Sequence, residues 1–342
     1  MTLERQDMYS PRARARTVAL LGAGGIANAH LPVWLELGFD VLVYSPAADA
    51  PALVARHGGG TVAPSLDAAL DAASLVDICT PTPTHHELAA AALARNLPTI
   101  CEKPLTRHAS DARQLVQDFA EAGIVLFPAH VVRYFPQYEA LHAAISRGDI
   151  GRPGVVRLTR QGGSPRSGWY LDDELSGGVV LDLMIHDLDI ARWIAGDVTK
   201  VFARTHRVGA SQSTQALLTH ESGAISQLTS TWTTAPIEFR TQVEVAGTEG
   251  LIRADSDERR TFRYVGIRQP EYDILPPYDP VTSPYRAEIL DFLSAVDTGA
   301  PSRVTAQDGL EALRIAEAIA ASVADGRSHE LSPTPTLEGV AL

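Results

Sequence analysis

The sequence predicts an α/β protein in two parts. The first is an N-terminal, doubly wound parallel sheet, and the second is a C-terminal α+β domain with a large, mostly antiparallel open sheet. The chain has 342 residues, more than one hydrophobic core usually serves. From residue 17 onward, short apolar runs alternate with helical patterns, an order typical of parallel strands joined by crossover helices. After residue 153 strand patterns follow one another across short polar turns, which favours antiparallel pairing.

The N-terminal elements are predicted from apolar runs and from signals at helix ends. Strands are expected at residues 17–21, 41–44, 76–79, 99–101 and 124–127, with helices between them. Thr84 followed by Glu87 has the pattern of a capping box before the alanine-rich residues 88–94. Gly38 lies where the first helix should end.

The second half is predicted to pair its strands mainly through hairpins. Strands are expected at residues 155–159, 201–205, 215–219, 224–230, 242–246 and 251–254. The turns that join them include Glu221-Ser222-Gly223 and Gly247-Thr248-Glu249-Gly250. Two helices follow, one over residues 286–296 and one that Thr305 and Asp308 cap and that ends at Gly326. Five prolines between Pro270 and Pro284 predict an irregular loop.

Composition and charge exclude several classes of protein. Hydrophobic residues make up 45% of the chain and charged residues 20%, as in globular proteins. The formal charge of −12 disfavours nucleic acid as a partner. No apolar stretch approaches the ~20 residues that cross a bilayer, and the first 16 residues lack the apolar region of a secretory signal, so we expect no membrane contact. The only cysteines, Cys79 and Cys101, lie in apolar runs, which leaves no disulfide framework or cysteine zinc site and fits a cytoplasmic protein.

A glycine-rich turn follows the first predicted strand. It reads Gly22-Ala23-Gly24-Gly25-Ile26-Ala27, the pattern GxGxxA, and a helical run comes after it. The first glycine permits the tight turn, the second lets the backbone approach a pyrophosphate, and the small last residue allows close helix–strand packing. We therefore expect a dinucleotide site at Gly22, Gly24, Gly25, Ile26 and Ala27, the alternative being a glycine turn without a ligand.

The end of the second predicted strand bears on the choice between NAD and NADP. An acidic residue there usually binds the ribose 2′-hydroxyl of NAD, and a nearby arginine accommodates the 2′-phosphate of NADP. This chain has Tyr44-Ser45-Pro46 at that point. Because Ser45 can hydrogen-bond either group, the choice between NAD and NADP stays open.

Lys103 lies in the sequence Cys101-Glu102-Lys103-Pro104, directly after an apolar strand. Ligands of open parallel sheets bind outside the carboxyl ends of the strands, so Lys103 is expected at the crevice. A lysine partly removed from water can exchange a proton with a carbonyl or carbinol oxygen. The alternative is a surface lysine in a turn.

Asp182 and His186 lie four residues apart in a helical pattern that runs to Gly196, so they should share one helix face. A carboxylate there can orient an imidazole that exchanges a proton with substrate. One alternative is a surface Asp–His pair. Another is metal ligation with Asp187 or Asp189, although no further cluster with metal spacing accompanies them and we expect no metal.

Together these residues resemble the Gfo/Idh/MocA family of glucose-fructose oxidoreductases and inositol dehydrogenases over nearly the whole chain. Glu-Lys-Pro followed about 80 residues later by Asp-x-x-x-His is more specific than the glycine turn. The other segments that carry the resemblance are Thr80-Pro81-Thr82-Pro83-Thr84-His85, Arg133-Tyr134-Phe135-Pro136, Gly148-Asp149-Ile150-Gly151 and Gly247-Thr248-Glu249-Gly250.

We expect a flexible tail at residues 1–15. The resemblance implies a dinucleotide-binding Rossmann domain, placed over 16–130, and a substrate-binding and oligomerisation domain, placed over 131–342. Lys103 would polarise the reacting oxygen, His186 would act as acid or base, and Asp182 would bind or orient beside it. Further cofactor contacts are implied for Thr80, Pro81, His85 and Glu102. The family's open sheet, together with apolar positions such as Leu217, Ile225 and Leu228 that one covering helix cannot reach, predicts a homodimer or homotetramer.

The expected function is NAD(P)-dependent hydride transfer to or from a secondary alcohol carbon of a sugar, cyclitol or related polyol. Arg166, Trp169 and Tyr170 precede the catalytic helix and are expected to contact substrate, because an aromatic plane beside polar groups suits a sugar ring. The alternative for Trp169 and Tyr170 is that they anchor the loop. Two other functions stay open, a regulatory or sensor protein that binds cofactor without turnover and a metal-dependent hydrolase.

Overall fold

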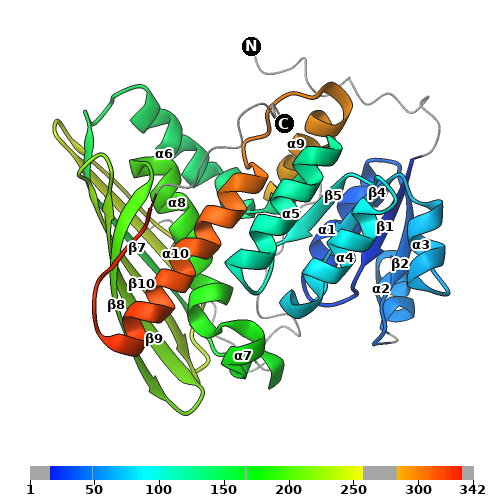
Figure 1. Cartoon of the computed structure of the whole chain (residues 1–342), viewed down its shortest axis with the longest axis horizontal. Helices are drawn as coiled ribbons and strands as arrows, with labels where there is room; N and C mark the ends of the chain where they lie inside the picture. The colour runs from blue at the N-terminus through cyan, green and yellow to red at the C-terminus, as the bar shows by residue number, and fades with distance from the viewer. Residues whose placement is uncertain (1–15, 48, 166–167, 257–282, 333–342) are drawn as a thin grey trace, which may run out of the picture.

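The computed structural model describes residues 16–47, 49–165, 168–256 and 283–332. The predicted tail at 1–15, the residue Arg166 and nearly all of the predicted proline-rich loop lie outside this described part. Figure 1 shows two sheets side by side with helices packed between them. No helix in the described residues is long and apolar enough to cross a membrane.

The N-terminal sheet is doubly wound and entirely parallel, as predicted. Its strand order is β3-β2-β1-β4-β5-β6, so the direction of winding reverses between β1 and β4. The sequence patterns located five of the six strands and missed β3, which has only two exposed residues. The strands are β1 (Thr17–Leu21), β2 (Asp40–Tyr44), β3 (Thr61–Val62), β4 (Leu75–Ile78), β5 (Thr99–Glu102) and β6 (Leu126–Ala129).

The helices of this domain follow the predicted order, with one wrong cap. Thr84 does not form a capping box with Glu87, because its backbone is already helical, with φ of −96° and ψ of −9°, and not extended as at a capping residue. Its hydroxyl lies 2.8 Å from Pro81 O and 2.7 Å from Thr80 Oγ1. Gly38 lies just beyond the first helix with φ of +80°, as expected of a helix-ending glycine. The helices are α1 (Ala27–Glu36), α2 (Ala50–His57), α3 (Leu66–Ala72), η1 (Thr82–Thr84), α4 (His85–Leu93) and α5 (Ala109–Ala122).

The C-terminal sheet is mixed and mostly antiparallel. Its order is β12-β11-β7-β10-β9-β8-β13, and within it only β7 and β10 run parallel. Both predicted hairpins are present, β9–β10 around residues 221–223 and β11–β12 around residues 247–250. The strands are β7 (Pro153–Gly163), β8 (Val198–Val208), β9 (Ser211–His220), β10 (Ile225–Thr233), β11 (Arg240–Gly247), β12 (Leu251–Asp255) and β13 (His329–Glu330).

Helical segments connect and cover the two sheets. The predicted capping box of Thr305 and Asp308 is present at the start of α10, and Gly326 ends that helix. The segments are η2 (Val131–Tyr134), α6 (Pro136–Ser146), η3 (Gly168–Leu171), α7 (Asp173–Ser176), the π-helical turn η4 (Val180–Met184), α8 (Ile185–Ala195), α9 (Pro284–Thr298) and α10 (Ala306–Asp325).

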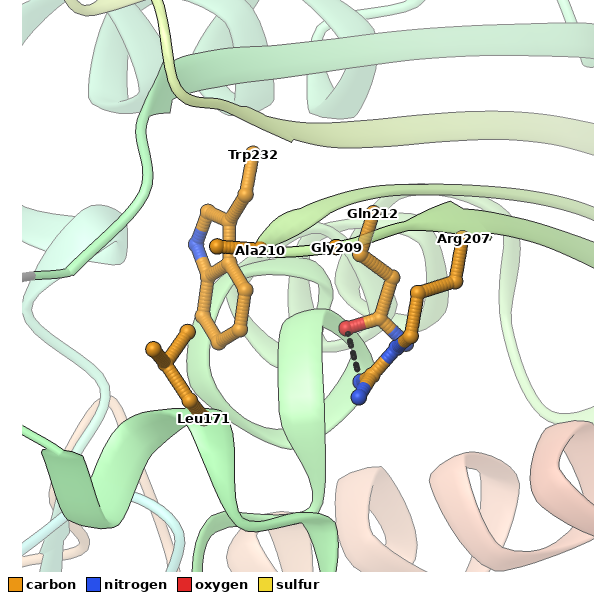
Figure 2. A pocket seen from close by; sticks show the side chains of 6 residues that line it. All are labelled: Leu171, Arg207, Gly209, Ala210, Gln212 and Trp232. Atoms are coloured by element: carbon orange, nitrogen blue, oxygen red, sulfur yellow. Dashed lines mark hydrogen bonds between the residues drawn. The ribbon is translucent and has the colours of Figure 1, made fainter.

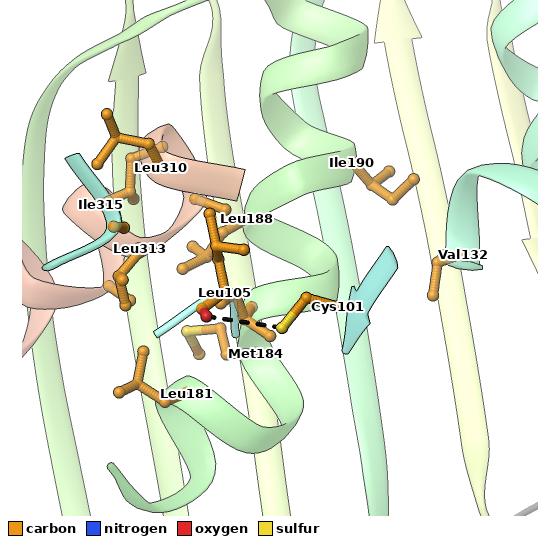
Figure 3. Packing of buried hydrophobic residues seen from close by; sticks show 14 of the residues in the cluster. Cys101, Leu105, Val132, Leu181, Met184, Leu188, Ile190, Leu310, Leu313 and Ile315 are labelled. Carbon is orange, nitrogen blue, oxygen red and sulfur yellow. Dashed lines mark hydrogen bonds between the residues drawn. The ribbon is translucent and has the colours of Figure 1, made fainter. Parts of the chain in front are cut away.

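A continuous apolar core joins the two sheets. Helix α10 packs on α8 and β8 on one side and on α5 on the other. Figure 3 shows the buried side chains that meet here. Among them are Leu105 after β5, Met184 in η4, Leu188 in α8 and Leu313 in α10. Helix α9 returns to the N-terminal sheet, where Phe292 packs edge-on against Phe127 of β6. This shared core fixes the crevice between the sheets.

The other face of the C-terminal sheet carries exposed apolar side chains. Leu228 is 1% exposed and faces the helices, whereas Leu217 and Ile225 are each 41% exposed on the other face. Phe202, on the same outer face, is 39% exposed. Alternation along the strands explains the difference, because successive side chains point to opposite faces. The structure therefore confirms that one helix layer does not cover Leu217, Ile225 and Leu228 together.

Candidate active site

The glycine turn lies at the carboxyl end of β1, beside the loop that follows β4. Gly22 has φ of +104°, and a Cβ at this position would lie 2.6 Å from the main-chain oxygen of Cys79. Its N–H donates to Tyr44 O at 2.8 Å, which ties the turn to β2. Only glycine fits so close an approach of two backbones, so Gly22 fixes the shape of the turn.

The rest of the turn has the form of an anion cradle. Gly24 and Gly25 are exposed, and a Cβ on either would meet no atom within 4 Å. Helix α1 starts at Ala27 with Ile26 at its N-cap and no acidic residue in its first turn, so the positive end of the helix dipole lies at this turn without a compensating carboxylate on the helix. Ala27 itself is fully buried against the sheet, as the small position of the pattern requires. These features fit a dinucleotide pyrophosphate.

Ser45 lies at the end of β2 and is half-buried. Its hydroxyl accepts a weak hydrogen bond from Ala47 N–H at 3.4 Å. Arg56, the nearest arginine along the chain, donates to Asn28 Oδ1 at 2.8 Å and thus contacts the glycine turn through Asn28. The surroundings of Ser45 leave the choice between NAD and NADP open.

Lys103 and Asp182 meet across the crevice. The Lys103 Nζ donates to the main-chain oxygen of Asp182 at 2.8 Å and lies 3.3 Å from Asp182 Oδ1. Both side chains are largely covered, at 16% and 22% exposure. Asp182 is thus a counter-charge that holds the ammonium group in place at the end of β5.

Asp182 and His186 do not form the pair that the spacing predicts. The structure has no hydrogen bond or ion pair between them, and Asp182 contacts Lys103 instead. Asp182 lies inside the π-helical turn η4, where both its carboxylate and its main-chain oxygen contact Lys103. His186 lies in the first turn of α8, and its Nδ1 is buried without a partner among the described residues.

The surroundings of His186 keep its imidazole neutral. Burial lowers the pKa of His186 well below its ordinary value of 6.5, and the positive charges of Lys103 and Arg160 lower the pKa further. His130, after β6, is itself buried and has no partner among the described residues for either ring nitrogen. Sequence reasoning missed His130 and Arg160, because neither belongs to a short motif and only the packing of η2 and β7 against α8 brings them near His186.

The two acidic residues that follow His186 are engaged in ion pairs. Asp187 accepts hydrogen bonds from Arg160, from Nε to both carboxylate oxygens at 3.2 Å and from Nη2 to Oδ1 at 2.8 Å. Asp189 accepts two from Arg133, at 2.5 and 2.8 Å. Both pairs are buried. With both carboxylates held by guanidinium groups, the geometry argues against their ligating a metal beside His186.

The loop before η4 brings aromatic side chains to the crevice. Trp169 and Tyr170 lie in η3 with their rings 3.9 Å apart. Burial raises the pKa of the Tyr170 hydroxyl, and the negative charges of Asp182 and Glu102 raise the pKa further, so this hydroxyl lies near both carboxylates. The structure therefore brings Tyr170 into the candidate site, whereas Arg166 lies outside the described residues.

The residues expected near the nicotinamide cluster after β4 and β5. The ring nitrogens of His85 each lie 2.8 Å from a main-chain oxygen, one of Pro104 and the other of Thr80. His85 thereby joins the loop that contains Pro81 to the loop that contains Lys103. Glu102 is buried and accepts from the N–H of Lys103 at 3.1 Å. These contacts align the two strand ends where a nicotinamide would lie.

A small cavity lies at the C-terminal sheet, between β8, β9, β10 and η3. It holds about 110 Å³, and Figure 2 shows its lining by Leu171, Arg207, Gly209, Ala210, Gln212 and Trp232. Gln212 Oε1 accepts from the N–H of Val179 at 3.1 Å, so the cavity lies at the start of the segment that carries Asp182. No sequence pattern pointed to it, because its lining comes from separate strands and turns.

A doubly wound sheet with an anion cradle at its switch point, facing a lysine and a histidine from two domains, defines a dinucleotide-dependent oxidoreductase. Comparison with known families agrees. Residues 16–130 match the model of the oxidoreductase family with an NAD-binding Rossmann fold, and residues 138–253 match that of the GFO/IDH/MocA C-terminal domain. The chain belongs to the Gfo/Idh/MocA family of oxidoreductases.

Individual relatives are dehydrogenases. The chain is 30% identical to the myo-inositol 2-dehydrogenase of Thermotoga maritima over 78% of this chain and 80% of that protein. It is also 30% identical to the D-apiose dehydrogenase of Paraburkholderia graminis, over 92% and 89% of the two chains. Among solved structures, GenD2 from gentamicin A biosynthesis in complex with NAD superposes with a TM-score of 0.85 at 27% identity, covering 95% and 98% of the two chains.

Proposed function

We propose that the chain is an NAD(P)-dependent dehydrogenase that oxidises a secondary alcohol carbon of a sugar, cyclitol or related polyol, reversibly. The contact of Lys103 with Asp182, next to a neutral His186, is the observation that carries this proposal. A hydrogen-bond donor at the end of β5, where ligands of such sheets bind, and a proton acceptor on α8 support this proposal.

The proton chemistry follows from these two side chains. Oxidation of the alcohol removes a hydride from carbon and a proton from oxygen, and a bound nicotinamide supplies the hydride acceptor. Lys103 Nζ, held by Asp182, donates a hydrogen bond to the reacting oxygen and orients it. His186, neutral because of burial and two nearby cations, accepts the hydroxyl proton, and it returns that proton in the reductive direction.

The cofactor and the substrate are assigned to different parts of the chain. Residues 16–130 hold the cofactor: the glycine turn binds the pyrophosphate, Ser45 the ribose near the adenine, and the group Thr80, Pro81, His85 and Glu102 the nicotinamide end. Residues 131–342 supply the substrate side, although α9 packs on the N-terminal sheet. The open cradle at Gly24 and Gly25 supports this division.

The substrate class is proposed from the aromatic loop, the cavity and the relatives. Curated relatives act on inositol and on D-apiose. Trp169 and Tyr170 offer an aromatic face beside Asp182, which suits a ring with one apolar face and a rim of hydroxyls. The cavity at Gln212 and Arg207 would receive the part of the substrate farthest from the nicotinamide. Arg166 is proposed as a further substrate contact.

A homodimer or homotetramer is proposed, with the exposed face of the C-terminal sheet as the interface. Phe202, Leu217 and Ile225 are the side chains that a second copy would cover. In sedimentation equilibrium, Leu217→Glu should shift the mass toward that of the monomer. A wild-type chain that is monomeric at micromolar concentration would refute the assembly.

The test of function is a cofactor titration followed by a substrate panel. NADH and NADPH fluorescence should respond to the protein, and at least one sugar or polyol should reduce the oxidised cofactor. Cofactor binding without turnover on any member of the panel would support a sensor instead. Activity that needs no nicotinamide and is lost with a chelator would support a hydrolase.

A further inference from the structure

A buried cluster of ionisable side chains lies directly behind Lys103. His30 comes from α1, Asp77 from β4, Glu102 from β5 and Glu288 from α9, and all four are at most 6% exposed. The proposed proton chemistry uses none of the charges of His30, Asp77 or Glu288. Burying several ionisable groups together costs much free energy unless they compensate one another, so their arrangement calls for a role.

His30 lies between two carboxylates. Its Nδ1 is 2.9 Å from Asp77 Oδ2, and its Nε2 is 3.4 Å from Glu102 Oε1. These two facing atoms, His30 Nε2 and Glu102 Oε1, have no hydrogen-bond partner among the described residues. A protonated His30 Nε2 can donate and Glu102 Oε1 can accept, so a small shift of either side chain would form a hydrogen bond between them. Asp77 is in turn fixed by Trp34 Nε1, which donates to its Oδ2 at 2.6 Å.

Glu102 connects this cluster to the reacting lysine. Its other oxygen, Oε2, accepts from the main-chain N–H of Lys103 at 3.1 Å. The position of the Glu102 side chain therefore influences the backbone from which Lys103 reaches Asp182. A chain of contacts runs from Asp77 through His30 and Glu102 to Lys103.

We propose that His30 is a positioning residue, an imidazolium that donates to both Asp77 and Glu102 and so fixes the backbone of Lys103 for hydride transfer. The inference rests on the proposed function of Lys103. No proton needs to leave His30 during turnover, because its role is to hold two strand ends at a fixed separation.

The groups that face His30 are consistent with its positive charge. Burial is the largest influence on His30 and lowers its pKa, but Asp77 and Cys79 together, through charge and hydrogen bonds, outweigh burial and raise the pKa well above 6.5. Cys79 stays a thiol, because burial and Asp77 raise its pKa, and the ring of Tyr285 packs 5.8 Å from that of His30. Burial and the Glu102 charge also raise the pKa of Glu288 well above its ordinary value. Neither carboxyl oxygen of Glu288 has a hydrogen-bond partner among the described residues, so the uncharged carboxyl is the favoured form at this buried position.

A metal ion is the competing explanation for His30, Asp77 and Cys79, whose donor atoms lie within 4.8 Å of one another. The geometry favours hydrogen bonds instead. Asp77 Oδ1 already accepts from the thiol of Cys79 at 3.3 Å, and Oδ2 accepts from Trp34. A metal would also require the thiolate, which the raised pKa of Cys79 opposes.

The first experiment is ¹⁵N NMR of the histidine rings in the full-length, cofactor-free protein, with His30→Gln as the assignment control. We expect both ring nitrogens of His30 to stay protonated at pH values well above 6.5. A neutral His30 ring at neutral pH overturns the proposal, and so does stoichiometric zinc in the protein as isolated. Because this measurement needs no turnover, failure of the proposed function leaves it interpretable.

The second experiment compares kinetics of His30→Gln, Asp77→Asn and Glu288→Gln. The first two should lower kcat by about 10- to 100-fold, the range for a small misplacement of a reacting group, with a smaller change in KM for substrate. Glu288→Gln is the matched control, since a protonated carboxyl and an amide are both neutral, and should keep wild-type kcat and a protonated His30. Unchanged kcat in folded His30→Gln overturns the positioning role.

Discussion

The ammonium group of Lys103 lies 2.8 Å from the main-chain oxygen of Asp182 and 3.3 Å from its carboxylate, although the two residues belong to different domains. This contact joins the carboxyl end of β5 to the η4 segment, which directly precedes α8 and His186.

Lys103→Met should remove most of the turnover. The ammonium group is the proposed donor to the reacting oxygen, so kcat should fall by roughly the 10²–10⁴-fold typical of such groups. The cofactor dissociation constant should change little, because the pyrophosphate is held by the glycine turn. Lys200→Met is the matched control, since Lys200 pairs with Glu330 on the surface and should leave kcat unchanged. Wild-type kcat in Lys103→Met would remove this lysine from the mechanism.

The pKa of His186 should rise when Lys103 is neutralised. After burial, Lys103 is the largest cause of the lowered pKa of His186, so its loss in Lys103→Met removes a repelling charge. Histidine NMR signals followed over pH would show this as a midpoint closer to 6.5. An unchanged midpoint would mean that the two side chains do not interact.

The lowered pKa of His186 also determines how the free energy of unfolding changes with pH. A depressed folded-state pKa means that the unfolded chain binds a proton at His186 more readily than the folded chain does. The stability from neutral His186 is therefore present above pH 6.5 and is lost as pH falls through the folded pKa. In urea titrations, His186→Gln should show a weaker loss of unfolding free energy below pH 6.5 than wild type. A steeper loss in the variant would contradict the assignment.

Two glycines of the same turn should respond differently to alanine. Gly22→Ala places a methyl group 2.6 Å from Cys79 O at a positive φ, so the fold itself should be destabilised and Tm lowered. Gly24→Ala meets open space in the free protein, so Tm should stay near wild type. Its methyl group would instead occupy the pyrophosphate cradle and raise the cofactor dissociation constant. Tight cofactor binding by Gly24→Ala would argue against the cradle.

The sequence predicted the parallel sheet well because each buried strand is a short apolar run between helical patterns. It missed β3, whose two residues are exposed and carry no such signal. At the site, Gly22 and Lys103 were predicted because strand ends of this fold define where ligands bind. The direct Asp182–His186 pairing failed because a spacing of four residues does not fix where each side chain points, and Lys103, distant in the sequence, contacts the Asp182 carboxylate instead. His30, His130 and Arg160 were missed because only tertiary packing brings them to the site.

Arg133 should prove more important for stability than a surface arginine. It donates two hydrogen bonds to Asp189 and one to Arg303 O at 2.8 Å, and its side chain is 3% exposed. Arg133→Gln leaves Asp189 as a buried carboxylate without its partner and should cost about 3–5 kcal/mol of unfolding free energy. Arg147→Gln, at an exposed pair with Asp149, should cost less than about 1 kcal/mol. Equal costs would show that the buried pair does not contribute as its geometry indicates.

Deuterium transfer tests the central claim most directly. Inositols, aldoses and related polyols deuterated at their secondary carbons would be incubated with the enzyme and each oxidised cofactor, and the cofactor would then be analysed by mass spectrometry. The account predicts deuterium on the nicotinamide with at least one substrate in wild type, and a rate at least about 100-fold lower in Lys103→Met. A wild-type protein that binds the cofactor but transfers deuterium from none of these substrates would contradict the proposed hydride transfer.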